Sequence, residues 1–362
     1  MKTQRYDRQL KLEGFGPEKQ QLLNQAAVLV IGAGGLGVPV LQYLTAMGTG
    51  KLGIVEYDTI SITNLQRQVL YHTSEEGQPK LQTAIRRLQQ LNPEIQFIAH
   101  DTWLTPENAL DIIAGYDVVV DCSDNFGTRY LVNDACVILN KPFVYGAIHK
   151  YEGQVSVFNY KGSATYRCLF PEQPEPGAML NCSDIGVLGI LPGIIGSYQA
   201  NETVKIICGI GEPLSNQLLT IDTLYNTHYT FRITPVPGNH NITALQDSYE
   251  QPCDTGGVKS LTVQQLQEWL EAGRPLQLID VREADEWEVC SLEQALHVPM
   301  RMIGGIIPKL QRDVPVALLC HHGMRSLMVA QQLDAAGFPF VYNVEGGIHA
   351  WACEIDEEMN IY

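Results

Sequence analysis

The stretch CHHGMRS holds the residue types that are most able to do covalent chemistry in this chain. It follows the apolar run VPVALL and precedes a helix-like run. A glycine-bearing turn between a strand and a helix directs N–H groups toward the cysteine sulfur, so the loop favours an anionic sulfur. Such a thiolate can attack phosphorus, as in a phosphatase, or carry a sulfane sulfur. Phosphatase loops of this kind have five residues between the cysteine and the arginine, whereas only four separate them here, so the shorter loop favours sulfur transfer. The loop consists of Cys320, His321, His322, Gly323, Met324 and Arg325.

A glycine-rich turn near the start of the chain indicates a nucleotide site. In IGAGGLG, Gly32, Gly34 and Gly37 have GxGxxG spacing between an apolar run and a helix-like run, so backbone N–H groups can approach a phosphate. Glu56, near the end of the next apolar run, stands where a ribose-binding acid belongs in a dinucleotide site. A tight turn without a ligand and a nicotinamide dinucleotide site are both compatible with this pattern.

The residues that follow favour a triphosphate over a nicotinamide cofactor. A triphosphate carries more negative charge than a dinucleotide, and Arg67 and Lys80 supply cations to meet it. In VVVDCSDN, Asp124 and Asn125 come at the carboxyl end of a strand, where a doubly wound sheet binds its ligands. Asp124 can hold magnesium on the phosphates.

Residues 1 to about 235 resemble the adenylating domain of the ubiquitin-activating superfamily, in its bacterial MoeB, ThiF and HesA branch. The resemblance rests on RYDRQ, GAGGLG, SITNLQRQ, GQPK, DCSDN and NCSDIGVLG. It implies a domain that binds ATP and magnesium and adenylates the C-terminal Gly-Gly carboxylate of a small ubiquitin-fold protein. It also implies a homodimer in which Arg8 reaches the nucleotide of the other protomer.

The same resemblance assigns residues to the nucleotide site, with Arg67, Lys80 and Arg8 as catalytic residues and Asp124 as the magnesium ligand. The nucleotide-binding set is Gly32, Gly34, Gly35, Gly37, Glu56, Asp58, Thr63, Asn64, Leu65, Gln66, Arg67, Lys80, Asp124 and Asn125. Cys182, in NCSDIG, lies just ahead of an expected helix, whose dipole would favour the thiolate. Its position alone fits a packing cysteine equally well, and the resemblance favours a reactive one that takes up the activated carrier.

The chain departs from this family at the zinc site that many relatives have. The first C-x-x-C pair is reduced to TYRC, which keeps only Cys168, and the second position reads PGNHNI. We therefore predict no structural zinc.

Residues 258 to about 358 resemble a rhodanese domain, through LIDVREADEW, CHHGMRS and VEGGIHAW. The resemblance implies that Cys320 carries a persulfide and that Asp280 and Arg282 form a structural pair. We expect His321 and His322 to be loop residues rather than metal ligands, because the sequence offers no further ligand cluster beside them.

The pattern of strands and helices predicts an α/β protein of two domains. Alternating strands and helices predict a doubly wound, mostly parallel sheet, and period-two runs at 153–160 and 218–234 add antiparallel strands. An apolar helix is expected over 183–209, capped by Ser183. We place the adenylating domain at 1–235, a linker at 236–257 and a smaller α/β rhodanese domain at 258–362.

Composition narrows the possible partners and compartment. The net charge of −16 argues against a nucleic-acid surface, and no apolar run is long enough to span a bilayer. The nine cysteines follow no disulfide framework, so we expect free thiols and a cytoplasmic protein.

The two halves together predict adenylation of a carrier, most readily a MoaD-like one, followed by sulfur transfer from Cys320 to give a thiocarboxylate for molybdenum cofactor biosynthesis. The same chemistry on a ThiS-like carrier for thiazole synthesis is an alternative. A nicotinamide oxidoreductase fused to a sulfur domain and a non-catalytic scaffold are alternatives of other classes. The sulfur donor is either thiosulfate or a cysteine desulfurase.

Overall fold

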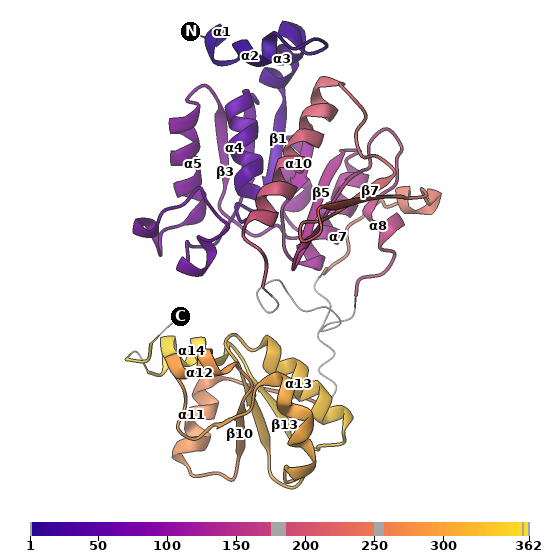
Figure 1. Cartoon of the computed structure of the whole chain (residues 1–362). Helices are drawn as coiled ribbons and strands as arrows, with labels where there is room; N and C mark the ends of the chain where they lie inside the picture. The colour runs from indigo at the N-terminus through magenta and orange to yellow at the C-terminus, as the bar shows by residue number, and fades with distance from the viewer. Residues whose placement is uncertain (1, 175–185, 250–256, 357, 361–362) are drawn as a thin grey trace. The chain divides into compact units, whose positions relative to one another are not determined.

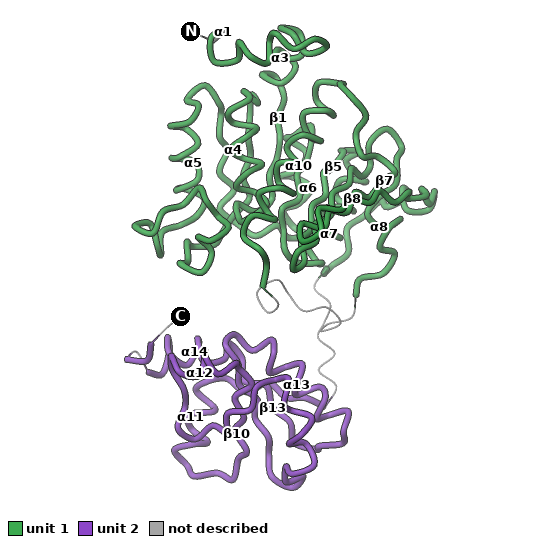
Figure 2. Tube along the Cα trace, viewed as in Figure 1, with its two compact units in different colours: residues 1–251 green, residues 252–362 purple. Residues whose placement is uncertain are grey.

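The chain folds into two compact units in a computed structural model, and each is described by itself (Figures 1 and 2). They cover residues 1–251 and 252–362. The structure describes residues 2–174, 186–249, 257–356 and 358–360.

An eight-stranded sheet forms the centre of the first unit. Its order is β3-β2-β1-β4-β5-β6-β7-β8, with parallel pairing from β3 to β5 and antiparallel pairing from β5 to β8. The prediction of a doubly wound sheet with an antiparallel extension is confirmed. The strands are β1 Ala27–Ile31, β2 Lys51–Val55, β3 Gln96–His100, β4 Val118–Asp121, β5 Phe143–His149, β6 Glu152–Phe158, β7 Gln217–Asp222 and β8 Thr227–Arg232.

Helices cover both faces of this sheet. Successive side chains of the central strand β1 point to opposite faces, and those on both faces are apolar and buried. Val28 and Val30 join the core under α4, α5 and α10, whereas Leu29 and Ile31 join the core under α6, α7 and α8 (Figure 1). The helices are α1 Lys2–Arg5, α2 Asp7–Leu10, α3 Gly16–Gln25, α4 Gly37–Met47, α5 Lys80–Leu91, α6 Ala109–Ala114, α7 Phe126–Ile138, α8 Tyr166–Leu169 and α10 Ile190–Cys208, with short 3-10 turns η1 Ile62–Asn64, η2 Thr73–Glu75 and η3 Pro237–His240.

Helix α10 begins later than the apolar pattern predicts. Gly189 is its N-cap, and Gly186 has a φ of +79°, which is outside the helical region. Val187 instead forms an isolated bridge with Lys150. The expected continuous helix over 183–209 is therefore wrong, because Gly186 leaves the helical region and α10 begins only at Ile190. Ser183, the expected cap, lies outside the described residues.

The segment that follows β8 packs onto the first unit as far as Tyr249. The Tyr249 ring is buried, and its hydroxyl donates to Asp134 Oδ2 at 2.7 Å. Leu245 packs against the same core. Residues up to Tyr249 of the segment that we assigned to a linker are thus folded against the first unit.

The second unit is a five-stranded parallel sheet of order β11-β10-β12-β13-β9. Its strands are β9 Lys259–Leu261, β10 Gln277–Asp280, β11 Leu296–His297, β12 Val316–Leu319 and β13 Val341–Val344. Its helices are α11 Val263–Glu271, α12 Ala284–Val289, α13 Met324–Ala335 and α14 Gly347–Glu354, with 3-10 turns η4 Met300–Gly305 and η5 Ile307–Lys309. Two apolar clusters, one on each face, complete the predicted small α/β domain.

Among the described helices, none combines the length and apolar character that crossing a bilayer demands.

Candidate active sites

The glycine turn after β1 brings backbone close to a cavity. Gly32 has a φ of +91°, a backbone conformation that residues other than glycine rarely adopt. A Cβ on Gly37, the first residue of α4, would collide with the Gly32 carbonyl oxygen. The turn therefore depends on glycine at both positions, and it leaves the N-terminus of α4 open toward the cavity.

This cavity, of about 260 Å³, lies at the carboxyl ends of β1, β2 and β4. It is the position at which doubly wound sheets bind ligands. Its lining includes ten of the residues predicted from the sequence: Gly32, Gly34, Gly35, Glu56, Asp58, Asn64, Arg67, Lys80, Asp124 and Asn125.

Arg67, Lys80 and the exposed carboxylate of Asp124 lie together in this lining. Lys80 begins α5 and is 4% exposed, and its ammonium donates to Asp58 Oδ2 at 2.8 Å. The Arg67 guanidinium donates to the Thr63 carbonyl oxygen at 3.1 Å. Asp124 is exposed. The cavity thus offers two cations for phosphate oxygens and a carboxylate with the oxygen chemistry that magnesium prefers.

Glu56 ties three loop amides together at the edge of the cavity. Its carboxylate accepts from the Ala33 N–H at 2.8 Å and from the N–H groups of Tyr57 and Asp58, both at 2.9 Å. Glu56, which we expect to bind the ribose, therefore also holds the glycine turn against the end of β2.

The sequence analysis missed several lining residues, and three of them are polar or aromatic side chains at the cavity: Gln68, Arg129 and Trp103. Gln68 and Arg129 are buried, and within the described residues neither Gln68 Oε1 nor Arg129 Nε has a hydrogen-bond partner. Trp103 is 61% exposed, and its ring lies 5.6 Å from that of Tyr57. Trp103 follows β3, so the rule that ligands bind at carboxyl ends of strands could have indicated it.

Other predicted residues do not line the cavity. They are Gly37, Thr63, Leu65, Gln66 and Arg8. Thr63 supports Arg67 through its carbonyl oxygen, and Gly189 packs closely against Gln66. Asn125 lines the cavity and also caps α7, since its Oδ1 accepts from the Thr128 N–H at 2.8 Å. Cys182 lies outside the described residues.

Cys168, in the stretch TYRC, is surrounded by hydrogen-bond donors. Its Sγ accepts from the N–H groups of Thr165 and Val236, at 3.4 and 3.3 Å, and from Asn239 Nδ2 at 3.5 Å. Burial acts to raise the pKa of this thiol, but the hydrogen bonds from Thr165, Val236 and Asn239 outweigh burial and lower the pKa below its ordinary value. Asn239 belongs to PGNHNI, so this stretch supplies a hydrogen-bond donor to the Cys168 sulfur.

In the second unit, the Cys320 sulfur lies at the end of β12 and at the start of α13. It accepts from the Gly323 N–H at 3.1 Å and from Ser326 Oγ at 3.3 Å. Gly323 is the N-cap, with a φ of +93°. Cys320 is only 1% exposed. The loop therefore directs one backbone N–H and one hydroxyl at a sulfur that lies below the surface.

Two ion pairs fix the surroundings of this loop. Arg282 and Asp280 are fully buried and 2.7 Å apart, which confirms the predicted structural pair. Arg325, in the first turn of α13, pairs with Glu286 of α12 through two contacts of 2.6 Å. The partner of Arg325 was not predicted from the sequence.

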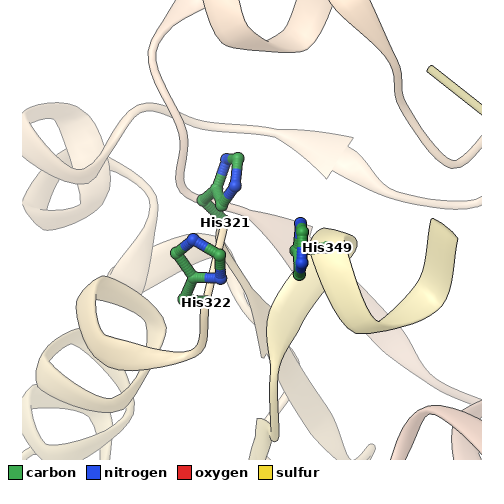
Figure 3. Close-up of side chains that lie close together, drawn as sticks. All are labelled: His321, His322 and His349. Atoms are coloured by element: carbon green, nitrogen blue, oxygen red, sulfur yellow. The ribbon is translucent and has the colours of Figure 1, made fainter. Parts of the chain in front are cut away.

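A third histidine approaches the two in the loop. His349, from α14, lies with His321 and His322 so that one nitrogen of each falls within 4.8 Å of the others (Figure 3). Burial, with the neighbouring His322 and His349, lowers the pKa of His321 to about 4; burial also lowers that of His322. Our reason for setting His321 and His322 aside as ligands is therefore wrong, because the fold supplies a neighbour 27 positions away in sequence from His322.

Fold and cavities define a nucleotide-binding α/β domain joined to an α/β unit with a cysteine loop. The family model for the ThiF family matches residues 6–242, and that for the rhodanese-like domain matches residues 262–354. The chain belongs to the ThiF family and carries a C-terminal rhodanese-like domain.

Two curated relatives are similar over almost the whole chain. The probable adenylyltransferase/sulfurtransferase MoeZ of Mycobacterium tuberculosis is 40% identical, over 99% of this chain and 95% of its own. The adenylyltransferase and sulfurtransferase MOCS3 of Drosophila sechellia is 40% identical, over 99% of this chain and 84% of its own. The chain is thus an enzyme of the adenylyltransferase and sulfurtransferase class, which disfavours the nicotinamide and scaffold alternatives.

Among solved structures, E. coli MccB with ATP has a TM-score of 0.53 and 23% identity, and the match covers 61% of this chain and 67% of MccB. At this identity the likeness concerns the fold alone.

Proposed function

We propose that the protein uses ATP and magnesium to adenylate the C-terminal Gly-Gly carboxylate of a ubiquitin-fold sulfur carrier, and then replaces the adenylate with sulfur from Cys320. The observation that carries this proposal is the cavity in which Arg67, Lys80 and Asp124 converge beside the glycine turn. The carrier is MoaD-like and the product serves molybdenum cofactor biosynthesis. A ThiS-like carrier is the alternative.

In the first step, a carboxylate oxygen of the carrier attacks the α-phosphorus of ATP, and pyrophosphate leaves. This reaction needs charge neutralisation and in-line positioning more than an acid or a base. Arg67 and Lys80 neutralise the phosphates, Asp124 holds the magnesium ion, and the glycine turn with Glu56 and Asn64 positions the nucleotide. Arg8 reaches the nucleotide from the second protomer of a homodimer.

In the second step, the outer sulfur of a Cys320 persulfide attacks the acyl carbon, and AMP leaves. The persulfide extends the reactive atom by about 2 Å beyond the buried Sγ. Alternatively, the Cys182 thiolate first displaces AMP to form a thioester with the carrier, and the persulfide then displaces Cys182. In either route a small-molecule thiol attacks Cys320 Sγ and releases the thiocarboxylate, while that thiol and Cys320 form a disulfide. Thiosulfate or a cysteine desulfurase restores the persulfide after reduction.

The test is the intact mass of MoaD-like and ThiS-like carriers after incubation with the protein, ATP, magnesium, thiosulfate and a thiol reductant. Replacement of one oxygen by sulfur on a single carrier supports both steps and identifies the substrate. Adenylate without sulfur on either carrier would contradict the sulfur step with thiosulfate. No modification of either carrier would contradict the assigned carrier class.

A further inference from the structure

Three imidazoles from two separate segments meet beside the persulfide loop. His321 and His322 follow β12, and His349 lies in the first turn of α14. The ring centroids of His321 and His322 are 4.1 Å apart, and those of His322 and His349 are 4.8 Å apart. Figure 3 shows the three rings around a common space.

Backbone contacts hold the two segments in this arrangement. The Ile348 N–H donates to the Cys320 carbonyl oxygen at 2.8 Å, and the His349 N–H donates to that of His321 at 3.1 Å. Gly347 has a φ of +60°, and a Cβ there would collide with both carbonyl oxygens. The approach of His349 to the loop is therefore part of the fold and does not depend on an imidazole contact.

One nitrogen of the cluster lacks a partner. His349 Nδ1 is buried, and no hydrogen-bond partner for it occurs in the described part of the chain. A buried polar atom without a partner costs free energy, so such atoms in native proteins often mark a bound ion or water. A metal ion among the three rings would satisfy it.

We infer that His321, His322 and His349 form a binding site for a divalent d-block cation of the Zn²⁺ class. Imidazole nitrogens suit Zn²⁺, Ni²⁺ and Co²⁺, whereas Mg²⁺ and Ca²⁺ prefer oxygen ligands, and the cluster contains no carboxylate. Three histidines leave a fourth position open for water or an exogenous ligand. The site is separate from the cysteine-based zinc site whose absence we predict.

The observed spacing needs only a small adjustment to hold an ion. Nitrogens bound at about 2.0 Å around a tetrahedral ion are about 3.3 Å apart, compared with the largest separation of 4.8 Å here. His322 is exposed, so its ring can rotate toward the other two without repacking the core. A bound ion would join the Cys320 loop to α14 and stabilise the second unit by mass action.

The experiment uses the full-length chain with Cys320→Ser and Cys353→Ser, so that neither nearby thiol can bind the probe; Cys353 Sγ lies 3.8 Å from His349 Nε2. Co²⁺ is titrated into chelator-treated protein, followed by visible absorption and by the melting temperature. His322→Ala is added in one variant and His349→Ala in a second; the exposed His228, on β8 of the first unit, provides the control His228→Ala. Because His322 is exposed, its replacement leaves the fold intact.

We expect His322→Ala and His349→Ala each to weaken one Co²⁺ site by at least about tenfold, since even residues that merely support a ligand change metal affinity by that much. In both variants Co²⁺ should raise the melting temperature by less than it does in the parent. His228→Ala should behave as the parent. Identical titration curves for the parent and His322→Ala would overturn the proposal. Equal weakening by His228→Ala would also overturn it.

Discussion

Arg325 and Glu286 face each other across α13 and α12 as a two-point ion pair, with both nitrogen–oxygen distances at 2.6 Å. Both side chains are less than one-fifth exposed. The arginine that closes the cysteine loop is therefore anchored by a carboxylate from another helix. This anchoring links the position of the loop to the packing of α12.

Glu286→Ala should lower the free energy of unfolding of the second unit by about 2 kcal/mol, because charge-assisted hydrogen bonds between partly buried groups are lost. Urea denaturation measures the change. Glu288, exposed on the same helix, provides the control Glu288→Ala, which should change stability by less than about 0.5 kcal/mol. Equal effects of the two substitutions would mean that the pair has no special role.

Lys80→Ala should reduce adenylate formation by about 100-fold or more, because it removes a buried cation from the proposed phosphate site. Arg67→Ala should act in the same direction. ATP–pyrophosphate exchange in the presence of carrier measures this step. Lys11→Ala, at an exposed lysine on the surface, is the control. Exchange at the parental rate in Lys80→Ala would place the nucleotide elsewhere.

Asp124→Asn should raise the magnesium concentration required for half-maximal exchange, because a neutral amide binds the ion less strongly than a carboxylate. Chelation of magnesium should abolish exchange in the parent protein. Asp101, an exposed carboxylate that bonds to Gln82, provides the control Asp101→Asn. A magnesium dependence that does not shift in Asp124→Asn would exclude Asp124 as the ligand.

Cys320→Ala should retain adenylation and abolish thiocarboxylate formation, because only the sulfur step uses this thiol. The two products are distinguished by the intact mass of the carrier. Cys353, an exposed cysteine of the same unit, provides the control Cys353→Ala, which should form both products. Thiocarboxylate at the parental level in Cys320→Ala would remove Cys320 from the mechanism.

Cys168→Ala should lower the free energy of unfolding of the first unit by about 1–2 kcal/mol, because the donors from Thr165, Val236 and Asn239 lose their shared acceptor. Chemical denaturation of the full chain, followed by fluorescence, measures the change. Cys353→Ala again provides the comparison. No difference between the two variants would show that these sulfur contacts contribute nothing to stability.

The amino-acid sequence by itself was sufficient for the fold class and for the local motifs. The periods of apolar residues predicted the parallel sheet, and IGAGGLG and CHHGMRS predicted two turns whose glycines the structure finds at positive φ, at Gly32 and Gly323. These features are local, because strand alternation and turn geometry depend on neighbouring residues. For the same reason, the sequence could place Asp124 and Asn125 at the carboxyl end of a strand.

Contacts between distant segments were decided only by the tertiary structure. Apolar composition could not reveal that α10 starts at Ile190, since Gly186 has a positive φ and Val187 forms a bridge with Lys150. Tyr249 packs on Asp134, Glu286 pairs with Arg325, and His349 reaches the cysteine loop through backbone hydrogen bonds of α14. Each contact joins residues that share no periodic pattern, so it arises only when the sheets bring their loops together.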